Sequence, residues 1–337
     1  MKKVSILIAL VFVFGLSSIA EARDFPSRPF TNLVVFSAGG TTDLQQRVLQ
    51  EFWQEEFGQP IALEYMPGAG GQIGWDNLMG RQPDGYTVAP NNLPHINLQP
   101  IMRKTVYTTQ NHIDGAIAGL VIDPVMVGVR QDSRFKSIQD LIDFAKKNPG
   151  RVTAGIVGEF TGDWLDLKKL ERTLDIKLAE VVFPGSADVV AALLGGHIDI
   201  KLGNVGCIMT ADPEEYRILM IGFREMPAIL KPYLDQVGNP PLSIDIGIDW
   251  LGGIPRGLFT HPKVPKDRLE ILRKGVWNII NKERYAQRMF EVGLPMYNQT
   301  GEDYAEFIRK FHEETIDIMV SLDHLEMVDG KPRPKKK

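Results

Sequence analysis

The stretch FSAGGTTDLQQRVLQEFWQEEFG, residues 36–58, decides the fold, because a glycine turn within it joins a short apolar run to a long amphipathic one. The apolar run, residues 32–36, predicts a strand. After the turn, apolar side chains recur three or four residues apart, as on the buried face of a helix: Leu44, Val48, Leu49, Phe52 and Trp53. We expect Thr42 or Asp43 to cap the start of this helix and Gly58 to end it.

The same succession of strand, turn and helix recurs along the chain. Further strands are predicted within residues 60–65, 86–90, 151–157, 178–184, 198–205 and 256–262. Further helices, some with their leading turn, are predicted within residues 73–82, 137–150, 158–175, 185–196, 266–282 and 302–320. Ser137 and Asp140 have the spacing of a capping box. Because alternating strands and helices indicate parallel strands with right-handed crossovers, the predicted fold class is α/β.

A chain of 337 residues is longer than one compact core usually accommodates, which predicts two lobes. The sequence has no low-complexity linker that would separate them. We therefore expect lobe one to be built from both ends of the chain and lobe two from its middle. Each lobe should hold a mixed sheet flanked by helices.

Residues 1–22 have the features of a secretory signal peptide. Two lysines precede an uncharged apolar run, residues 4–16, and the small-residue pattern Ala20-Glu21-Ala22 follows. The apolar run is shorter than the roughly 20 residues of a membrane-spanning helix. We expect cleavage after Ala22 and export of a soluble mature protein.

The charge of the chain does not suggest a polyanionic partner. The formal net charge is −4, and the dense basic cluster is confined to the C-terminal PRPKKK, which we interpret as a solvated tail. We therefore expect neither nucleic acid nor an anionic membrane as a partner. The chain has one cysteine, so it has no internal disulfide.

Three predicted turns share a glycine, a hydroxyl side chain and a position directly before a helix. They are FSAGGTTD (36–43), GIVGEFTGD (155–163) and FPGSAD (183–188). A helix N-terminus carries about half a positive charge and several unpaired N–H groups, which suits it to an anion. In open α/β sheets, ligands lie beyond the carboxyl ends of the strands, where these turns are placed. Alternatively, glycine only permits a tight turn and the hydroxyl only caps the helix.

Nucleotide-binding and catalytic motifs are weak or absent in the sequence. The first turn lacks the lysine of a phosphate-binding P-loop. The loop PGAGGQIG, residues 67–74, is close to a dinucleotide fingerprint, but Ile73 stands where that pattern requires glycine. The histidines have no zinc-binding spacing, and no G-x-S-x-G elbow is present. We expect no catalysis, metal or cofactor, and the alternative is an exported α/β enzyme that uses a dinucleotide.

Five segments, in this order, resemble the Bug receptors, the periplasmic solute-binding subunits of tripartite tricarboxylate transporters. They are FPSRPFTNLVVFSAGGTTD (25–43), GQPIALEYMPGAGGQIG (58–74), QPDGYTV (82–88), FPGSADVVAALLGGHID (183–199) and IPRGLFTHPKVPKDRL (254–269). The resemblance implies a two-lobed clamshell in which the chain crosses between the lobes near residues 121–127 and 252–259. Lobe one would then comprise residues 23–124 and 255–337, and lobe two residues 125–254.

Members of this family bind small carboxylates through backbone amides, hydroxyls and bridging waters from both lobes. The resemblance therefore implies a monomeric periplasmic protein that captures a small organic anion and delivers it to integral membrane subunits of a transporter. A clamshell that signals to a membrane kinase is a further alternative. In lobe one, the resemblance implies ligand contacts from Phe36, Ser37, Gly39, Gly40, Thr41, Thr42, Asp43, Ala69, Gly70, Gly71, Asn91 and Asn92. In lobe two, it implies contacts from Gly158, Glu159, Phe160, Thr161, Gly162, Phe183, Gly185, Ser186, Ala187 and Asn204.

The sequence departs from the family at both loops. The usual first-loop pattern is P-F-x-P-G-G-x-x-D, and here Val35 and Ala38 replace its prolines. The second-lobe loop, usually small and rich in Gly, Ser and Asn, here carries three larger or acidic residues: Glu159, Phe160 and Asp163.

A carboxylate beside an anionic ligand is unfavourable unless it is paired or protonated. We therefore predict a ligand other than a tricarboxylate. It would be smaller, singly charged, or equipped with an amine or hydroxyl that faces Glu159, with Phe160 against an apolar body. The alternative is that Glu159 points to solvent or forms a salt bridge with Arg256 or a nearby lysine.

Overall fold

The computed structural model describes residues 25–209 and 211–335. The predicted signal peptide lies outside these ranges, so its cleavage after Ala22 stays a prediction. Within the described ranges, no helix combines the length and the apolar character that a membrane crossing requires.

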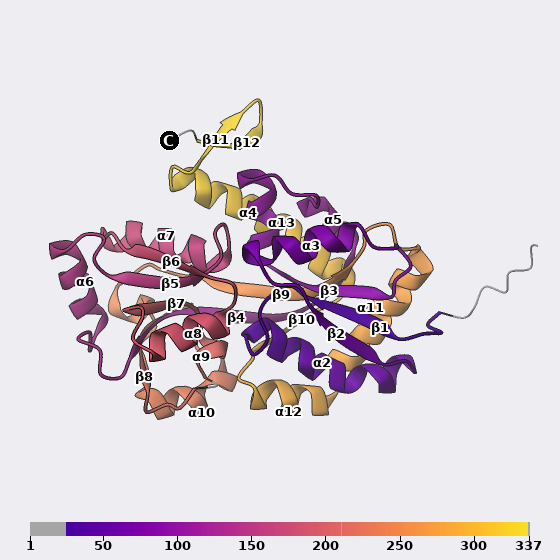
Figure 1. Cartoon of the computed structure of the whole chain (residues 1–337), viewed down its shortest axis with the longest axis horizontal. Helices are drawn as coiled ribbons and strands as arrows, with labels where there is room; N and C mark the ends of the chain where they lie inside the picture. Colours follow the sequence, from indigo (N-terminus) through magenta and orange to yellow (C-terminus); the bar gives the residue numbers. More distant parts are fainter. Residues whose placement is uncertain (1–24, 210, 336–337) are drawn as a thin grey trace, which may run out of the picture.

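Ten strands of the described residues join into one sheet with the order β2-β1-β3-β9-β4-β7-β5-β6, in which β8 and β10 also pair with β4. Figure 1 shows an elongated molecule in which these strands run through the middle, with helices on both sides. The bounds of the strands are β1 (Phe30–Val34), β2 (Ile61–Tyr65), β3 (Thr87–Asn92), β4 (Ala116–Arg130), β5 (Thr153–Val157), β6 (Ala179–Phe183), β7 (Ile200–Asn204), β8 (Tyr216–Gly222), β9 (Gly253–Thr260) and β10 (Met296–Gln299).

The long strand β4 belongs to both halves of the molecule. Up to Pro124 it pairs with β9, and from Val125 onward it pairs with β7 and β8. We call the part with β1, β2, β3, β9 and β10 the first sheet, and the part with β5 to β8 the second sheet. Each contains parallel pairs, such as β1–β2 and β5–β6, beside antiparallel pairs made by β4 or β9. The predicted α/β class with mixed sheets is confirmed.

Helices cover both sheets, as Figure 1 shows. Those that accompany the first sheet are α2 (Thr41–Phe57), α3 (Gln72–Met79), α4 (His95–Met102), α5 (Thr109–Asp114), α11 (Lys266–Ile280), α12 (Glu283–Glu291) and α13 (Gly301–Ser321). Those that accompany the second sheet are α6 (Ile138–Lys147), α7 (Gly162–Leu174), α8 (Ser186–Leu194), α9 (Val205–Ile208) and α10 (Lys231–Leu234).

The helix predicted from the opening stretch is α2. Four residues of its apolar stripe are buried and Leu44 is half-buried; the buried ones are Val48, Leu49, Phe52 and Trp53. The helix ends at Gly58, which has a left-handed φ of 66°, as predicted. The predicted cap is wrong, because Gly40 occupies the N-cap position and no side chain caps it. Asp43 lies in the first turn, and its carboxylate accepts a hydrogen bond from the Gly39 N–H at 2.7 Å.

The C-terminal segment differs from the predicted solvated tail. Residues 331–334 form the strand β12 (Lys331–Pro334), which pairs with β11 (Leu325–Val328) in a hairpin beyond α13. Leu325 at its base is only 1% exposed, in an apolar cluster with Trp164. Because that burial anchors the hairpin beside α4 and the end of α13 (Figure 1), the basic residues on β12 adopt a strand although they stay exposed.

Candidate functional site

Three helix N-termini meet at one small cavity between the first and second sheets. α2 begins after β1, α7 after β5 and α8 after β6, so all three follow the carboxyl ends of parallel strands. The cavity has a volume of about 20 Å³, room for a single water molecule. It is lined by Phe36, Gly40, Thr41, Thr42, Asn92, His95, Val157, Asp163, Ser186, Asn204, Ile254 and Arg256.

Loops from the two sides of this cavity touch one another. The Thr41 N–H donates to Ser186 Oγ at 3.2 Å, which joins the start of α2 to the start of α8. The Gly162 N–H donates to His95 Nδ1 at 3.3 Å, which joins α7 to α4. The structure is therefore a closed arrangement, in which a ligand larger than water enters only after the loops separate.

Arg256 brings a buried cation to the cavity. Its Nη1 lies 3.1 Å from Asp123 Oδ2, and its Nη2 donates to Asn204 Oδ1 at 2.7 Å. Both charged side chains are almost fully buried, at 2% and 0% exposure. Burial raises the pKa of Asp123, and the neighbouring guanidinium opposes that rise. The other carboxylate oxygen of Asp123 accepts from the Gly206 N–H at 3.1 Å, so the pair is held in one geometry.

Two further titratable side chains line the cavity. Asp163, in the first turn of α7, accepts from the Val157 N–H at 3.1 Å, and burial raises its pKa to about 6 against the opposing charge of Lys201. Burial, together with the positive charge of Arg256, lowers the pKa of His95 to about 3. His95 is therefore neutral at pH 7, consistent with Nδ1 acting as an acceptor.

Several polar atoms at the cavity have no hydrogen-bond partner within the described residues. They are Thr41 Oγ1, Asn92 Oδ1 and Arg256 Nε. A buried polar atom without a partner is unfavourable by about 1–3 kcal/mol. A small polar ligand that supplied these partners would remove that penalty, and the Arg256 N–H together with the three helix N-termini favours an anionic group.

The structure brings part of the predicted ligand-binding set to the cavity. The residues predicted from the sequence that line it are Phe36, Gly40, Thr41, Thr42, Asn92, Ser186 and Asn204. Those that lie next to lining residues along the chain without lining the cavity are Ser37, Gly39, Asp43, Asn91, Gly158, Glu159, Phe160, Thr161, Gly162, Phe183, Gly185 and Ala187. Ala69, Gly70 and Gly71 lie in the loop between β2 and α3, which contributes no lining residue. Some of these have structural partners; for example, Asn91 Oδ1 accepts from the Tyr304 hydroxyl at 2.7 Å.

Glu159 is exposed and does not line the cavity. The salt bridge considered between Glu159 and Arg256 is wrong, because Arg256 lies on the buried strand β9 and pairs with Asp123 instead. Phe160 packs against Trp164, with ring centroids 5.2 Å apart. The loop 158–161 thus turns its two largest side chains away from the cavity.

Sequence reasoning did not place five of the lining residues at the site: His95, Val157, Asp163, Ile254 and Arg256. Arg256 carried a signal, because a charged residue within a predicted buried strand needs a partner or a ligand. Asp163 had been noted as a departure in the second-lobe loop. The lining role of the apolar residues had no signal in the sequence.

The glycine-rich loop at residues 67–74 is packed rather than open. An added Cβ on Gly70 would lie 2.8 Å from Thr161 Cγ2, and one on Gly71 would lie 2.8 Å from the Trp75 ring. These glycines therefore allow close approach of neighbouring side chains, and the alternative of a dinucleotide enzyme is not favoured. No group of His, Cys, Asp or Glu among the described residues could hold a metal ion.

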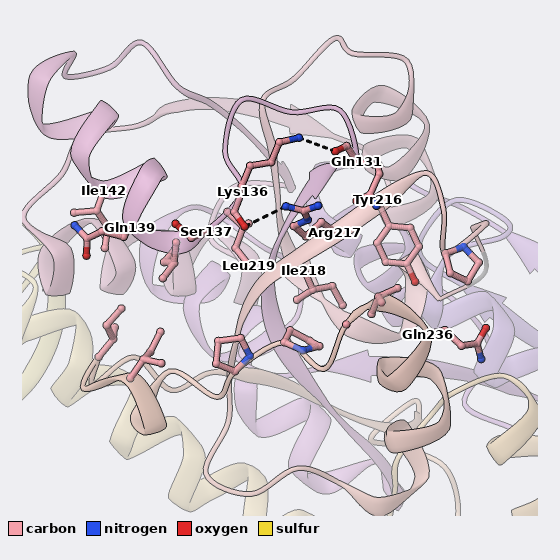
Figure 2. A pocket seen from close by; sticks show the side chains of 18 residues that line it. Gln131, Lys136, Ser137, Gln139, Ile142, Tyr216, Arg217, Ile218, Leu219 and Gln236 are labelled. Carbon is pink, nitrogen blue, oxygen red and sulfur yellow. Dashed lines mark hydrogen bonds between the residues drawn. The ribbon is translucent and has the colours of Figure 1, made fainter.

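A larger hollow lies elsewhere, with a volume of about 800 Å³, between α6, β8 and residues 236–248 (Figure 2). Its two cations are engaged by backbone carbonyls, since Lys136 Nζ donates to Gln131 O and Arg217 Nη1 donates to Lys136 O (Figure 2). None of its lining residues belongs to the cavity at the three helix N-termini. Its volume exceeds that of the cavity, but both of its cations already have hydrogen-bond partners within the protein.

Comparisons with known proteins show the family of this chain and relatives of its fold. The sequence model of a family described as the tripartite tricarboxylate transporter family receptor matches residues 45–322. The UPF0065 protein in the gbd 5′ region of Cupriavidus necator is 27% identical over 297 residues, covering 86% of this chain and 85% of the relative. The periplasmic binding protein BugD has the same fold, with a TM-score of 0.80, 20% identity and coverage of 89% and 99% of the two chains. The R. palustris protein Rpa4515, solved with adipate, has a TM-score of 0.80, 19% identity and coverage of 89% and 99%.

Proposed function

Because this chain belongs to the tripartite tricarboxylate transporter receptor family, we propose that it captures a small organic carboxylate in the cavity and delivers it to the membrane subunits of such a transporter. Family membership makes the protein a solute-binding receptor; the identity of its ligand and the contacts to that ligand are proposed. The main support for both is that three helix N-termini and the buried cation of Arg256 converge on a single cavity. Rpa4515, which has the same fold, was solved with a small organic carboxylate, adipate.

The proposed clamshell has lobe one at residues 23–124 and 255–337 and lobe two at residues 125–254. The change of partners along β4, between Pro124 and Val125, supports the first crossing. The start of β9 at Gly253 supports the second. Ligand binding would close the lobes, and the closed form would be the one that the transporter recognises.

In the proposed closed complex, the ligand carboxylate accepts hydrogen bonds from Arg256 Nε, from the Thr41 hydroxyl and from N–H groups at the starts of α2 and α8. Charge-assisted bonds of this kind are stronger than neutral ones. Family membership implies a periplasmic protein. Cleavage after Ala22, a monomeric state and the absence of enzymatic activity belong to the proposal.

Thermal unfolding of residues 23–337 tests this function. The probes are mono-, di- and tricarboxylates, amino acids and NADP. A ligand at a hundred times its dissociation constant stabilises the folded state by about 2.7 kcal/mol, which raises the unfolding midpoint. We expect a shift with one or more carboxylates. A shift with NADP alone would instead indicate the dinucleotide enzyme.

A matched pair of variants locates the site. Thr41→Val removes the buried hydroxyl without changing the side-chain shape, and should weaken carboxylate binding roughly 10- to 100-fold. Thr173→Val makes the same change at an exposed position on α7 and should leave affinity unchanged. If calorimetry gave the two variants equal affinities for the carboxylate, Thr41 would not be a ligand contact.

A further inference from the structure

Side chains of opposite charge, Arg256 and Asp163, line the same cavity. Arg256 is 2% exposed and comes from β9, whereas Asp163 is 3% exposed and comes from the first turn of α7. Arg256 has an ion-pair partner in Asp123. Asp163 accepts one hydrogen bond from the Val157 N–H and has no salt bridge within 4 Å among the described residues. The site therefore holds a carboxyl group at the place where an anionic ligand would bind.

The charged and titratable groups around Asp163 balance one another. On the neighbouring elements these are Lys201 of β7, Arg256 of β9, Asp123 of β4, the neutral His95 of α4 and, on α7 itself, Asp166. Asp166 pairs with Lys169 at 3.2 Å. With Asp163 ionised, the two cations Lys201 and Arg256 face two carboxylates, and the buried cluster is neutral. An added ligand carboxylate would leave it with one uncompensated negative charge.

Uptake of one proton would restore that balance, and Asp163 is the group placed to accept it. The ion pair with Arg256 and the hydrogen bond from the Gly206 N–H both favour the ionised form of Asp123. Asp163 has no ion pair within 4 Å among the described residues, and burial raises its pKa to about 6, close to neutral pH. A bound anion beside it would favour its protonated form further.

Resting on the proposed function, we infer that Asp163 takes up a proton when an anionic ligand binds, so that the site selects a carboxylate carrying one negative charge. With Asp163 neutral, the cluster bears a single positive charge, which a monocarboxylate matches. A dicarboxylate would bring a second buried charge without a partner. A zwitterion would leave the net charge unchanged and would need no proton.

Isothermal titration calorimetry on residues 23–337 tests this with two matched series of probes. They are hexanoate, adipate and 6-aminohexanoate, and butyrate, succinate and 4-aminobutyrate. Titration in phosphate and in Tris, which have different ionisation enthalpies, gives the number of protons taken up. We expect a monocarboxylate to bind most tightly with uptake approaching one proton, and its affinity to fall about tenfold per pH unit above pH 6.

Asp163→Asn keeps the shape of the neutral acid and an oxygen that accepts from the Val157 N–H. This variant should bind the same monocarboxylate without proton uptake and with an affinity that is constant from pH 5.5 to 8.5. Asp175→Asn removes a carboxylate at the exposed C-terminal end of the same helix and should retain the wild-type pH dependence.

The outcomes separate this inference from the function on which it rests. Carboxylate binding that is independent of pH and takes up no proton would overturn the role of Asp163 and leave the receptor function intact. Tightest binding of a dicarboxylate or a zwitterion would overturn the selection of a single charge. If no probe bound at any pH, the proposed carboxylate function would fail together with the inference.

Discussion

Replacing Gly158 by alanine should disfavour closure of the loops without altering the residues that line the cavity. Gly158 lies between β5 and α7, has a φ of +69° and does not line the cavity. An alanine Cβ there would lie 2.7 Å from Gly70 Cα and 3.1 Å from Gly70 N, on the loop between β2 and α3. Because these neighbours are backbone atoms, a side-chain rotation cannot relieve the contact.

Two effects of the substitution have to be separated. The left-handed φ costs about 1–2 kcal/mol for a non-glycine residue, and this strain is present whether the loops are open or closed. The contact with Gly70 acts on the closed form alone, and overpacking of this kind costs about 1–3 kcal/mol. A closed form destabilised by that amount corresponds to an affinity about 5- to 150-fold weaker.

Gly150→Ala is the matched control, since Gly150 has a φ of +70° and its added Cβ would meet no atom within 4 Å. We expect both variants to lose similar stability in urea unfolding. Calorimetry with the carboxylate found by thermal unfolding should show weaker binding for Gly158→Ala alone. Small-angle scattering should show less ligand-induced compaction for that variant. Wild-type affinity and compaction in Gly158→Ala would refute the view that this contact forms on closure.

Three further predictions concern the buried charges and the C-terminal hairpin. Arg256→Met should lower the free energy of unfolding in urea by about 3–5 kcal/mol, because Asp123 stays buried without its partner, and adding Asp123→Asn should cost less than the sum of the single changes. Burial lowers the pKa of His95 in the folded protein, so between pH 6.5 and pH 5 this side chain takes up a proton in the unfolded state only. The free energy of unfolding should therefore fall by about 2 kcal/mol over this range through His95, and His95→Gln should lose correspondingly less. Deleting residues 323–337 should lower unfolding stability by about 2 kcal/mol through exposure of the cluster around Leu325, and an unchanged urea midpoint would contradict this.

Much of the fold was predictable because its signals are local. The helical spacing of Val48, Leu49, Phe52 and Trp53 predicted α2, and burial of those side chains confirms it. The capping box of Ser137 was likewise predictable, since both partners lie within one helical turn. Such patterns depend on residues near one another in the sequence, where backbone geometry sets the distances.

Features that depend on distant packing were missed. The hairpin β11–β12 forms where Leu325 finds an apolar cluster supplied by other elements. The full length of β4 follows from strands that pair with its two ends, since Pro124 and Val125 have different partners. No pattern within residues 116–130 indicates which strands pair with the two ends of β4.

The candidate site, like the fold, has a part that the sequence predicts and a part that depends on distant packing. Its loops were predictable, because glycine and hydroxyl residues before a helix mark an N-terminus suited to an anion wherever they occur. Which of Glu159 and Asp163 is the acidic residue at the cavity was not predictable, because Glu159 lies in the loop and Asp163 in the first turn of α7. That depends on which way the chain turns after β5.

The sequence by itself determined the α/β class, the order of the elements and the turns that hold helix N-termini at the strand ends. Only the tertiary structure decided the charge of the site. Asp123, Asp163, Lys201 and Arg256 come from four separate elements, and strand pairing together with the packing of α7 on the sheet sets their distances. In a buried cluster those distances decide which carboxyl is paired and which remains free to accept a proton, because charges away from water interact strongly and are poorly screened.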